Sequence, residues 1–393
     1  MTLASPFILP CGARLPNRLA KAAMSEDLGD RDHGASDALL ALYTRWSASG
    51  AGLLLTGNLM VDSRHLGEPG NVVSDTEAHL ERLQGWAAAS KRGGGAVWAQ
   101  LNHPGRQAPR TLTPRPVAPS SVGLSMLGLF ARPEALTEAG IHEVIERFAD
   151  GADRVRRAGF DGVQIHAAHG YLLSQFLSPR TNQRTDAWGG SLEARARLLL
   201  DVVRAVRARV GPAWPVSVKL NSADFQRGGF TADEAVRVAT WLGELGVDLL
   251  ELSGGNYEQP AMMGDRETTR QRTAYFMQYA EQVRAATAVP LMVTGGFRTR
   301  SGMDAALASG ALDIVGLARP FAVDPSFGRH LLDGAIAEID ASNPSSGFRK
   351  GDDLLAVAWY QAQFIRMAAG ADPDVGLGAW RTLFGKAIGT FWR

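Results

Sequence analysis

The sequence predicts an α/β fold, a (β/α)8 TIM barrel with a long loop after strand 3 and a C-terminal helical extension. Short apolar runs recur along the chain, and segments with a helical pattern separate them. Runs that are apolar throughout are typical of parallel strands, because both faces of such strands are buried. Eight of these units precede residue 340, which matches the size of a barrel.

The expected strands follow one another at residues 17–25, 50–58, 94–103, 159–166, 214–221, 246–255, 289–296 and 311–319. Between them lie helical stretches such as "SDALLALYTRWSAS" and "SLEARARLLLDVVRAVRARV". We expect Ser36 and Ser191 to cap these two helices, since a serine hydroxyl accepts from an unpaired N–H of the first turn. A doubly wound sheet is the competing architecture, but no G-x-G-x-x-G follows the first run, which disfavours it.

Two long loops follow strands, on the barrel face that carries active sites. Residues 102–140 are rich in proline and contain the apolar "SMLGLF", as a lid over a site would. The second loop, residues 253–272, includes Tyr257.

We assign residues 1–335 to the barrel and residues 336–393 to an extension that packs on the barrel or at an oligomer interface. The extension begins with a helical stretch and ends in an aromatic tail with Trp380, Phe384, Phe391 and Trp392.

Composition excludes several classes of function. The formal net charge is +1, so nothing indicates binding to nucleic acid or to an anionic membrane. The single cysteine, Cys11, excludes an intrachain disulfide and a cysteine-ligated cluster. No stretch approaches the ~20 apolar residues of a membrane span, and the N-terminus lacks the pattern of a signal peptide. We expect a cytoplasmic protein.

Two small-residue turns suggest a phosphate site. "TGGF" at 294–297 and "GLARPF" at 316–321 follow the last two strands, and the second carries Arg319. Barrels bind phosphate at this position through backbone N–H groups and a basic side chain. The alternative is that both are plain strand-to-helix turns.

Two polar residues interrupt otherwise apolar strands. An amide such as Gln100 suits a flat heterocycle, because it both donates and accepts; it is equally compatible with bonding to nearby backbone. Lys219 is the only charge in its strand, and a buried lysine is costly unless an anion pairs with it. Three interpretations of Lys219 remain open: it stabilises negative charge on a reduced cofactor, it forms a Schiff base as in aldolases, or it makes a structural salt bridge.

"HAAHGY" brings His166, His169 and Tyr171 to the end of the fourth strand. The two histidines suggest a metal site, but the surrounding pattern is strand then loop, and no third ligand is close in sequence. We therefore expect no metal. A pair of satisfied polar side chains is a second interpretation. The third is catalytic: two N–H donors for an oxygen that gains charge, beside a phenol that donates a proton.

The chain resembles the Old Yellow Enzyme family of FMN-dependent ene-reductases (NADH:flavin oxidoreductases). The block "HAAHGYLLSQFLSPRTNQRTDAWGGSLEARARLLLDVV" is similar to the family's motif H-x-x-[HN]-G-Y-L-x-x-Q-F-L-x-P-x-x-N-x-R-x-D-x-[YW]-G-G-S-x-E-x-R at nearly every fixed position. "QLNHPGR", "PVAPSSV", "GGF" and "GLARPF" also resemble family segments, in the same order. The resemblance covers about residues 5 to 335.

The resemblance implies an FMN barrel in residues 1–335, with NADPH or NADH as the hydride donor. The implied cofactor-binding residues are Ala23, Met24, Ser25, Gly57, Gln100, Lys219, Gly295, Gly296, Ala318 and Arg319. It further implies that His166 and His169 bind the activating oxygen of an enone or nitroalkene substrate, and that Tyr171 donates a proton to the carbon α to that activating group. We also expect a homo-oligomer, a dimer or larger.

The chain departs from the family pattern at several positions. Many members carry arginine at Lys219 and threonine or cysteine at Ser25, and Asp27 falls near a substrate-facing tyrosine of one subgroup. Two other functions remain as alternatives: an aldolase-like lyase that uses Lys219, and a non-catalytic flavin-binding or electron-donor protein on the same fold.

Overall fold

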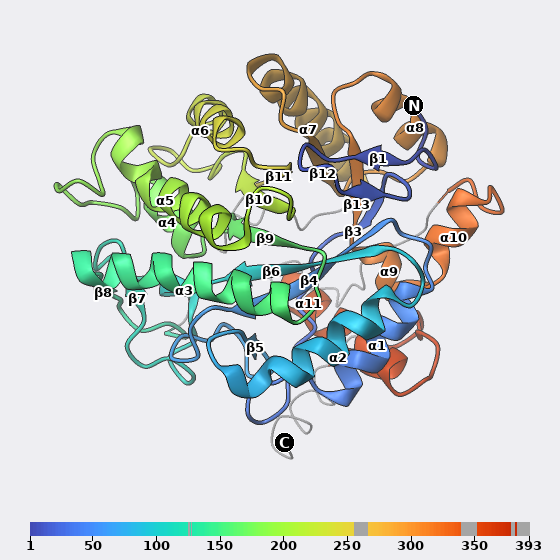
Figure 1. The fold of residues 1–393 in the computed structure, drawn as a ribbon, viewed down its shortest axis with the longest axis horizontal. Coiled ribbons are helices and arrows are strands. Elements are labelled where there is room, and N and C mark those ends of the chain that lie inside the picture. The colour runs from blue at the N-terminus through green and yellow to red at the C-terminus, as the bar shows by residue number, and fades with distance from the viewer. Residues whose placement is uncertain (125, 127, 255–265, 339–351, 379–381, 383–393) are drawn as a thin grey trace.

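The computed structural model describes residues 1–124, 126, 128–254, 266–338, 352–378 and 382. Eight parallel strands form the barrel: β3 (Leu19–Lys21), β4 (Leu53–Met60), β6 (Ala96–Asn102), β9 (Gly162–Ala167), β10 (Val216–Asn221), β11 (Leu249–Ser253), β12 (Leu291–Thr294) and β13 (Ile314–Leu317). Each pairs with the next, and β13 pairs with β3, which closes the barrel. Every strand expected from the sequence is present, so the predicted fold is confirmed (Figure 1).

Helices surround the strands: α1 (Asp37–Ser47), α2 (Leu80–Lys91), α3 (Glu138–Arg157), α4 (Leu172–Leu177), α5 (Leu192–Val210), α6 (Ala232–Glu244), α7 (Arg266–Ala286), α8 (Arg300–Ala308), α9 (Arg319–Val323) and α10 (Phe327–Leu332). The two predicted caps are confirmed. Ser36 accepts from the backbone N–H of Leu39, and Ser191 accepts from that of Ala194.

Among the described residues, five short strands lie outside the eight strands of the barrel. An N-terminal hairpin joins β1 (Phe7–Ile8) to β2 (Arg14–Leu15), and β5 (Val72–Val73) pairs in parallel with the end of β4. Within the long loop after β6, β7 (Val117–Ala118) pairs with β8 (Glu134–Ala135). The loop therefore has secondary structure of its own. Tyr257 and the aromatic tail residues Trp380, Phe384, Phe391 and Trp392 lie outside the described residues.

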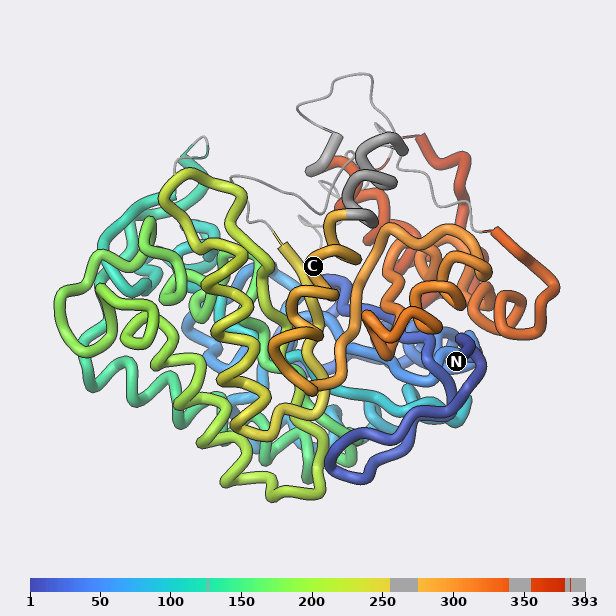
Figure 2. The backbone as a smooth tube through the Cα atoms, turned by 90° about the horizontal axis from the view of Figure 1, so that it is seen from above, coloured from blue at the N-terminus to red at the C-terminus, as the bar shows by residue number. Residues whose placement is uncertain are grey.

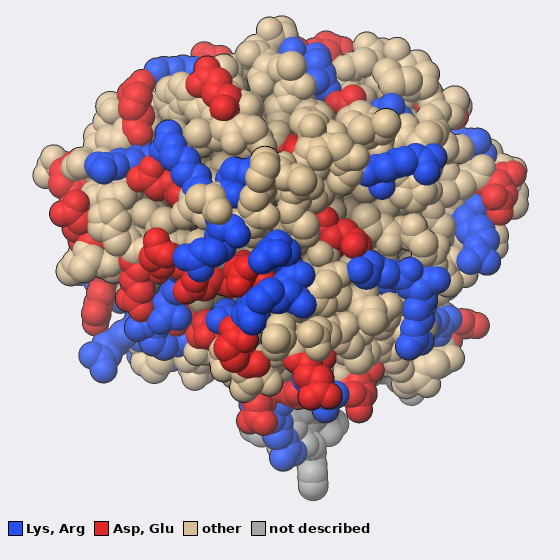
Figure 3. Space-filling model, in the orientation of Figure 1, with Lys and Arg blue, Asp and Glu red and all other residues tan. Residues whose placement is uncertain are grey.

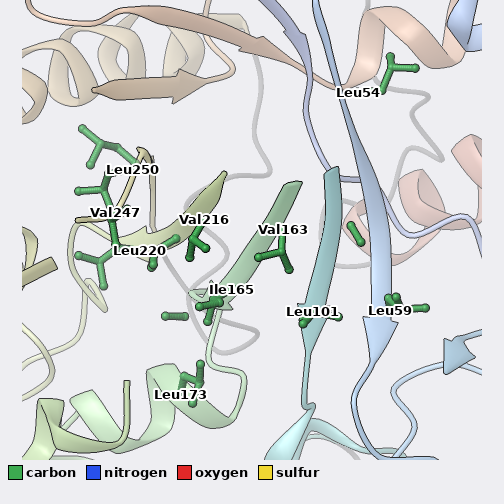
Figure 4. Close-up of a cluster of buried hydrophobic side chains, with 14 of the residues drawn as sticks. Leu54, Leu59, Leu101, Val163, Ile165, Leu173, Val216, Leu220, Val247 and Leu250 are labelled. Carbon is green, nitrogen blue, oxygen red and sulfur yellow. The ribbon is translucent and has the colours of Figure 1, made fainter. Parts of the chain in front are cut away.

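The alternation of side chains along each strand separates two environments. In β9, Val163 and Ile165 belong to the large core between the strands and the helices, together with Leu101 and Val216 (Figure 4). Apolar side chains also fill the lower part of the barrel interior, toward the N-terminal ends of the strands; they include Leu53, Leu55, Trp98, Leu249, Met292 and Ile314. Above them, the inward positions become polar, and these form the candidate site.

The predicted helix of the C-terminal extension is α11 (Asp352–Ala368), and it packs against α1 and α9. The Phe364 ring lies edge-on to Trp46 of α1, with the centroids 5.2 Å apart. Arg45 of α1 forms an ion pair with Asp372 at 2.6 Å. Figure 2 shows the orange and red C-terminal segments gathered on one side of the barrel.

The surface visible in Figure 3 carries interspersed acidic and basic side chains. Ion pairs of opposite charges also lie along α3, such as that of Arg157 with Asp153. A phosphate backbone would be recognised by a field of one sign, and this face has none. In the part of the chain that the structure describes, no helix has the length and apolar character needed to cross a bilayer.

Candidate active site

The rings of His166, His169 and Tyr171 form one cluster at the C-terminal end of β9. The His166 ring centroid lies 5.1 Å from that of His169 and 4.9 Å from that of Tyr171, both in edge-on contact. His166 and Tyr171 are nearly buried, with 3% and 9% of their surface exposed. His169 adopts a left-handed φ of 59°, uncommon for a residue with a side chain. Such strain is typical of functional sites, where the surrounding structure maintains it.

Hydrogen bonds fix which ring nitrogen of His166 carries the proton. The backbone N–H of Ala168 donates to His166 Nδ1 at 3.2 Å. Nδ1 is therefore an acceptor, and the proton of the neutral ring lies on Nε2. His169 is held by two contacts: its N–H donates to Asn221 Oδ1 at 3.1 Å, and its Nε2 lies 2.7 Å from Ser253 Oγ.

Both histidines are neutral at physiological pH. Burial lowers the pKa of His166 well below its usual value of 6.5, and the nearby His169 and Lys219 lower it further. Burial and Lys219 lower the pKa of His169 in the same direction. Because a charged ring is disfavoured here, both rings are neutral, and the one N–H of His166 lies on Nε2.

These pKa shifts predict a pH-dependent stability. Below pH 6.5 the unfolded chain takes up protons on both rings and the folded chain does not, so stability is full above pH 6.5 and is lost as the pH falls. The expected loss is up to about 1.4 kcal/mol per pH unit for each ring. Urea unfolding between pH 7 and 5 should therefore show a steeper loss for the parent than for a variant carrying His166→Gln and His169→Gln. Equal slopes would contradict the assigned shifts.

Lys219 lies on β10, next to His166 of β9 in the parallel register. Its Nζ donates to Glu251 Oε1 of β11 at 2.9 Å, and the two side chains are 5% and 0% exposed. The anion that a buried lysine requires is therefore present. Glu251 was not predicted from the sequence, although it is also the only charged residue in an apolar strand. A Schiff-base lysine needs a free amine, so this pairing disfavours the aldolase alternative.

Gln100 is 2% exposed and belongs to a chain of buried hydrogen bonds. Its Nε2 donates to Gln164 Oε1 at 2.7 Å, and Gln164 Nε2 donates to Glu251 Oε2 at 2.9 Å. The chain ends at Lys219, so the structure links the two polar strand residues singled out from the sequence. Gln164 was also missed, although it interrupts the apolar run of β9.

Ala23, Met24 and Ser25 follow β3 directly. Ala23 packs against the lower barrel interior and Met24 against the outer core. Ser25 Oγ hydrogen-bonds to the carboxylate of Glu68. Gln361 of α11 donates to the carbonyl of Ser25 at 3.4 Å and to Glu68 Oε1 at 3.2 Å, so the C-terminal extension reaches this end of the barrel.

Gly57 of β4 lies in close contact with the residues that follow β3. Its N–H donates to Glu26 Oε1 at 3.0 Å. A Cβ at this position would lie 1.9 Å from Glu26 Oε2 and 2.3 Å from the carbonyl oxygen of Met24, distances that no real Cβ tolerates. Only glycine fits between these two groups.

Gly57→Ala is therefore expected to destabilise the protein by about 1–3 kcal/mol or more, because the backbone carbonyl of Met24 cannot move as a side chain does. Urea unfolding measures this loss. Gly123→Ala is the matched control, since no atom of the residues that the structure describes lies within 4 Å of its added Cβ, and its effect should stay within about 0.5 kcal/mol. A similar small effect at Gly57 would contradict the packing.

The two small-residue turns lie at the ends of neighbouring strands. Gly295 and Gly296 follow β12 with left-handed φ values of 84° and 85°. Among the described residues, no atom lies within 4 Å of a Cβ placed on Gly295, which lets a ligand approach its backbone closely. Ala318 and Arg319 begin α9 after β13. A side-chain hydrogen bond joins Arg319 to Tyr360 of α11.

A separate cluster of Asp62, His65 and His103 has the composition of a metal site, with ligand atoms within 4.8 Å of one another. Two contacts count against a cation there. Arg64 donates to both oxygens of the Asp62 carboxylate. The N–H of Gly105 donates to His103 Nδ1, which leaves the ring proton on Nε2.

Residues 5–336 match the NADH:flavin oxidoreductase / NADH oxidase family. The NADH-dependent flavin oxidoreductase iliE of Hypocrea jecorina is 39% identical over 346 residues, covering 81% of this chain and 86% of that protein. The structure of the old yellow enzyme homologue from Zymomonas mobilis superposes with a TM-score of 0.74 and 27% identity, covering 86% of this chain and 95% of that chain. A variant of morphinone reductase in complex with tetrahydroNAD superposes with a TM-score of 0.72 and 29% identity, covering 86% of this chain and 92% of that chain.

The residues at the top of the barrel fit the flavin cofactor of this family. A buried amide and a buried ammonium, Gln100 and Lys219, offer the donors and the acceptor that a flavin pyrimidine requires. The open backbone at Gly295 suits a phosphate. The chain therefore belongs to the NADH:flavin oxidoreductase / NADH oxidase family, to which old yellow enzyme belongs, and is an oxidoreductase with FMN as its cofactor and NADH or NADPH as its hydride donor.

Proposed function

We propose that this enzyme reduces activated alkenes, namely α,β-unsaturated carbonyl or nitro compounds. The observation that carries the proposal is the cluster of His166, His169 and Tyr171, in which two neutral imidazole rings and a phenol pack edge-on at the end of β9. An alkene becomes reducible when an attached carbonyl or nitro oxygen takes up negative charge. Donors fixed in a buried site stabilise such charge more strongly than water does.

His166 and His169 bind that oxygen in the proposed reaction. Nε2 is the nitrogen of His166 that carries the proton, because Nδ1 accepts a hydrogen bond from the backbone. The low pKa of both rings keeps them from being charged before the substrate binds. The oxygen therefore gains hydrogen bonds that strengthen as its charge grows.

Tyr171 donates the proton that completes the reduction. Its position at the start of α4, against the His166 ring, keeps the phenol beside the oxygen-binding pair. A phenol has a reference pKa near ~10, so it is protonated at neutral pH and can donate to a basic carbon. The protonated carbon is the one α to the activating group.

We assign the cofactor side of the site to the strand ends around the cluster. FMN, when bound there, would supply the hydride transfer that links the nicotinamide to the β-carbon of the alkene. Gln100 would bond the pyrimidine edge, and Lys219 would hold the same part of the ring and stabilise the anionic reduced form. The remaining assigned cofactor contacts are Ala23, Met24, Ser25, Gly57, Gly295, Gly296, Ala318 and Arg319. The lysine ammonium keeps the charge of an arginine but not its fork geometry.

A substrate panel tests the proposal. Enones and nitroalkenes should be reduced with NADH or NADPH, whereas an unactivated alkene of the same size should not react, because it offers no oxygen to the histidine pair. His166→Ala should lower kcat/KM for enones by roughly 100-fold or more. Equal activity toward activated and unactivated alkenes would contradict the proposed role of the pair.

A further inference from the structure

Four buried polar side chains form a continuous chain across neighbouring strands of the barrel. Gln100 lies on β6, Gln164 on β9, Lys219 on β10 and Glu251 on β11, and their exposed fractions are 2%, 0%, 4% and 0%. These strands are adjacent in the sheet order. Gln164 and Glu251 have no role in the proposed reaction, so their burial requires a separate explanation.

The carboxylate of Glu251 orients the amides. A carboxylate only accepts hydrogen bonds, so Gln164 must turn its Nε2 toward Glu251, at 2.9 Å. Its Oε1 then faces Gln100 and accepts from Gln100 Nε2 at 2.7 Å. Gln100 is left with its Oε1 acceptor and one N–H for a ligand. Glu251 thus decides, through one intermediate, which way the Gln100 amide points.

The same carboxylate is the counter-ion of Lys219. Glu251 Oε1 accepts from Lys219 Nζ at 2.9 Å and from Thr294 Oγ1 at 2.7 Å. A ligand beside Lys219 therefore experiences an ion pair, not an isolated positive charge. In a buried site this difference is large, because charge interactions are weakly screened.

We propose that Glu251 is the positioning residue of the flavin pyrimidine site, and that it restrains how strongly the site favours reduced over oxidised FMN. It orients Gln100 through Gln164, and it offsets part of the Lys219 charge that would stabilise anionic reduced FMN. This proposal rests on the placement of Gln100 and Lys219 at the pyrimidine ring given above.

The first test measures the midpoint potential of bound FMN in the holoenzyme of Glu251→Gln, by equilibration with a reference dye. Removing the carboxylate charge should raise the affinity for reduced over oxidised FMN about tenfold, a positive shift of about 30 mV for a two-electron couple. Asp248→Asn is the matched control. Asp248 is an equally buried carboxylate, paired with Arg207 at 2.6 Å before β11 begins, and its removal should leave the potential unchanged. An unchanged potential in Glu251→Gln overturns the charge effect.

The second test separates orientation from charge. Gln164→Met breaks the link to Gln100 and leaves the Lys219–Glu251 pair in place. The dissociation constant of oxidised FMN should rise about fivefold, as expected for one weakened hydrogen bond, while the potential changes little. An unchanged dissociation constant overturns the orientation effect. If Glu251→Gln fails to fold, Gln164→Met still decides whether the chain orients Gln100.

Gln100→Leu tests whether Gln100 contacts the flavin pyrimidine ring at all. Loss of FMN affinity in this variant supports the position of Gln100 at the ring. In that case, an unchanged FMN dissociation constant in Gln164→Met overturns only the positioning role of Glu251. If Gln100→Leu binds FMN as tightly as the parent, the placement of Gln100 is wrong, and the orientation proposal falls with it.

Discussion

Tyr171→Phe should slow the reaction of the reduced enzyme with cyclohexenone by roughly 100-fold or more, because a general acid contributes about 10² to 10⁴ in rate. The phenol ring lies 4.9 Å from the His166 ring, centroid to centroid, and only its hydroxyl is lost in this variant. Packing and oxygen binding by the histidines should therefore persist. Stopped-flow absorbance of the flavin at increasing cyclohexenone concentration measures the rate.

The reduction of the enzyme by NADH or NADPH is the internal control for this variant. That reaction transfers hydride from the nicotinamide and needs no proton from Tyr171, so its rate should stay within about twofold of the parent. Equal slowing of both reactions would show that Tyr171 maintains the shape of the site and does not donate the proton.

Lys219→Met should lower the free energy of unfolding by about 3 kcal/mol, measured with urea in the absence of added FMN. The substitution leaves the carboxylate of Glu251 fully buried without its cation, and removal of one partner of a buried ion pair typically costs 3–5 kcal/mol. Hydrogen bonds from Gln164 and Thr294 to Glu251 remain, which places the expected loss at the lower end of that range.

The double variant Lys219→Met with Glu251→Met is the matched control. It replaces both charges with apolar side chains of similar size, which is often neutral for stability. Most of the stability lost in the single variant should return. If the double variant is less stable than Lys219→Met alone, the ion pair is not the reason for the loss.

The barrel could be predicted because each of its strands and helices is marked by a pattern within a short segment of the sequence. The barrel strands are buried on both faces, so a largely apolar run marks each of them, and some helices begin at a residue that caps them, as at Ser36 and Ser191. The order of strands around the barrel then follows from the right-handed β-α-β connection.

The site was predictable only in part. Lys219 stood out as a single charge in an apolar strand, and the same pattern marks Glu251, which was not identified. Their pairing depends on the register of β10 against β11, and register is set by three-dimensional packing that no single strand encodes. The orientation of Gln164 and Gln100 follows from that pairing and was equally inaccessible.

The contribution of α11 could not be predicted for a different reason. Gln361 contacts Ser25 across 336 residues of sequence, and Tyr360 contacts Arg319 from the same helix. The sequence predicts the helix from its composition, but nothing in its pattern indicates which end of the barrel it covers.

The most direct test of the central claim is the stoichiometry of the anaerobic reaction of the purified enzyme with cyclohexenone. If the cluster of His166, His169 and Tyr171 supports alkene reduction, one cyclohexanone should form for each NADH or NADPH consumed. Tyr171→Phe should oxidise the nicotinamide at the parent rate in a single turnover and then release cyclohexanone slowly. Oxidation of the nicotinamide only when oxygen is admitted, with no cyclohexanone formed, would contradict the account.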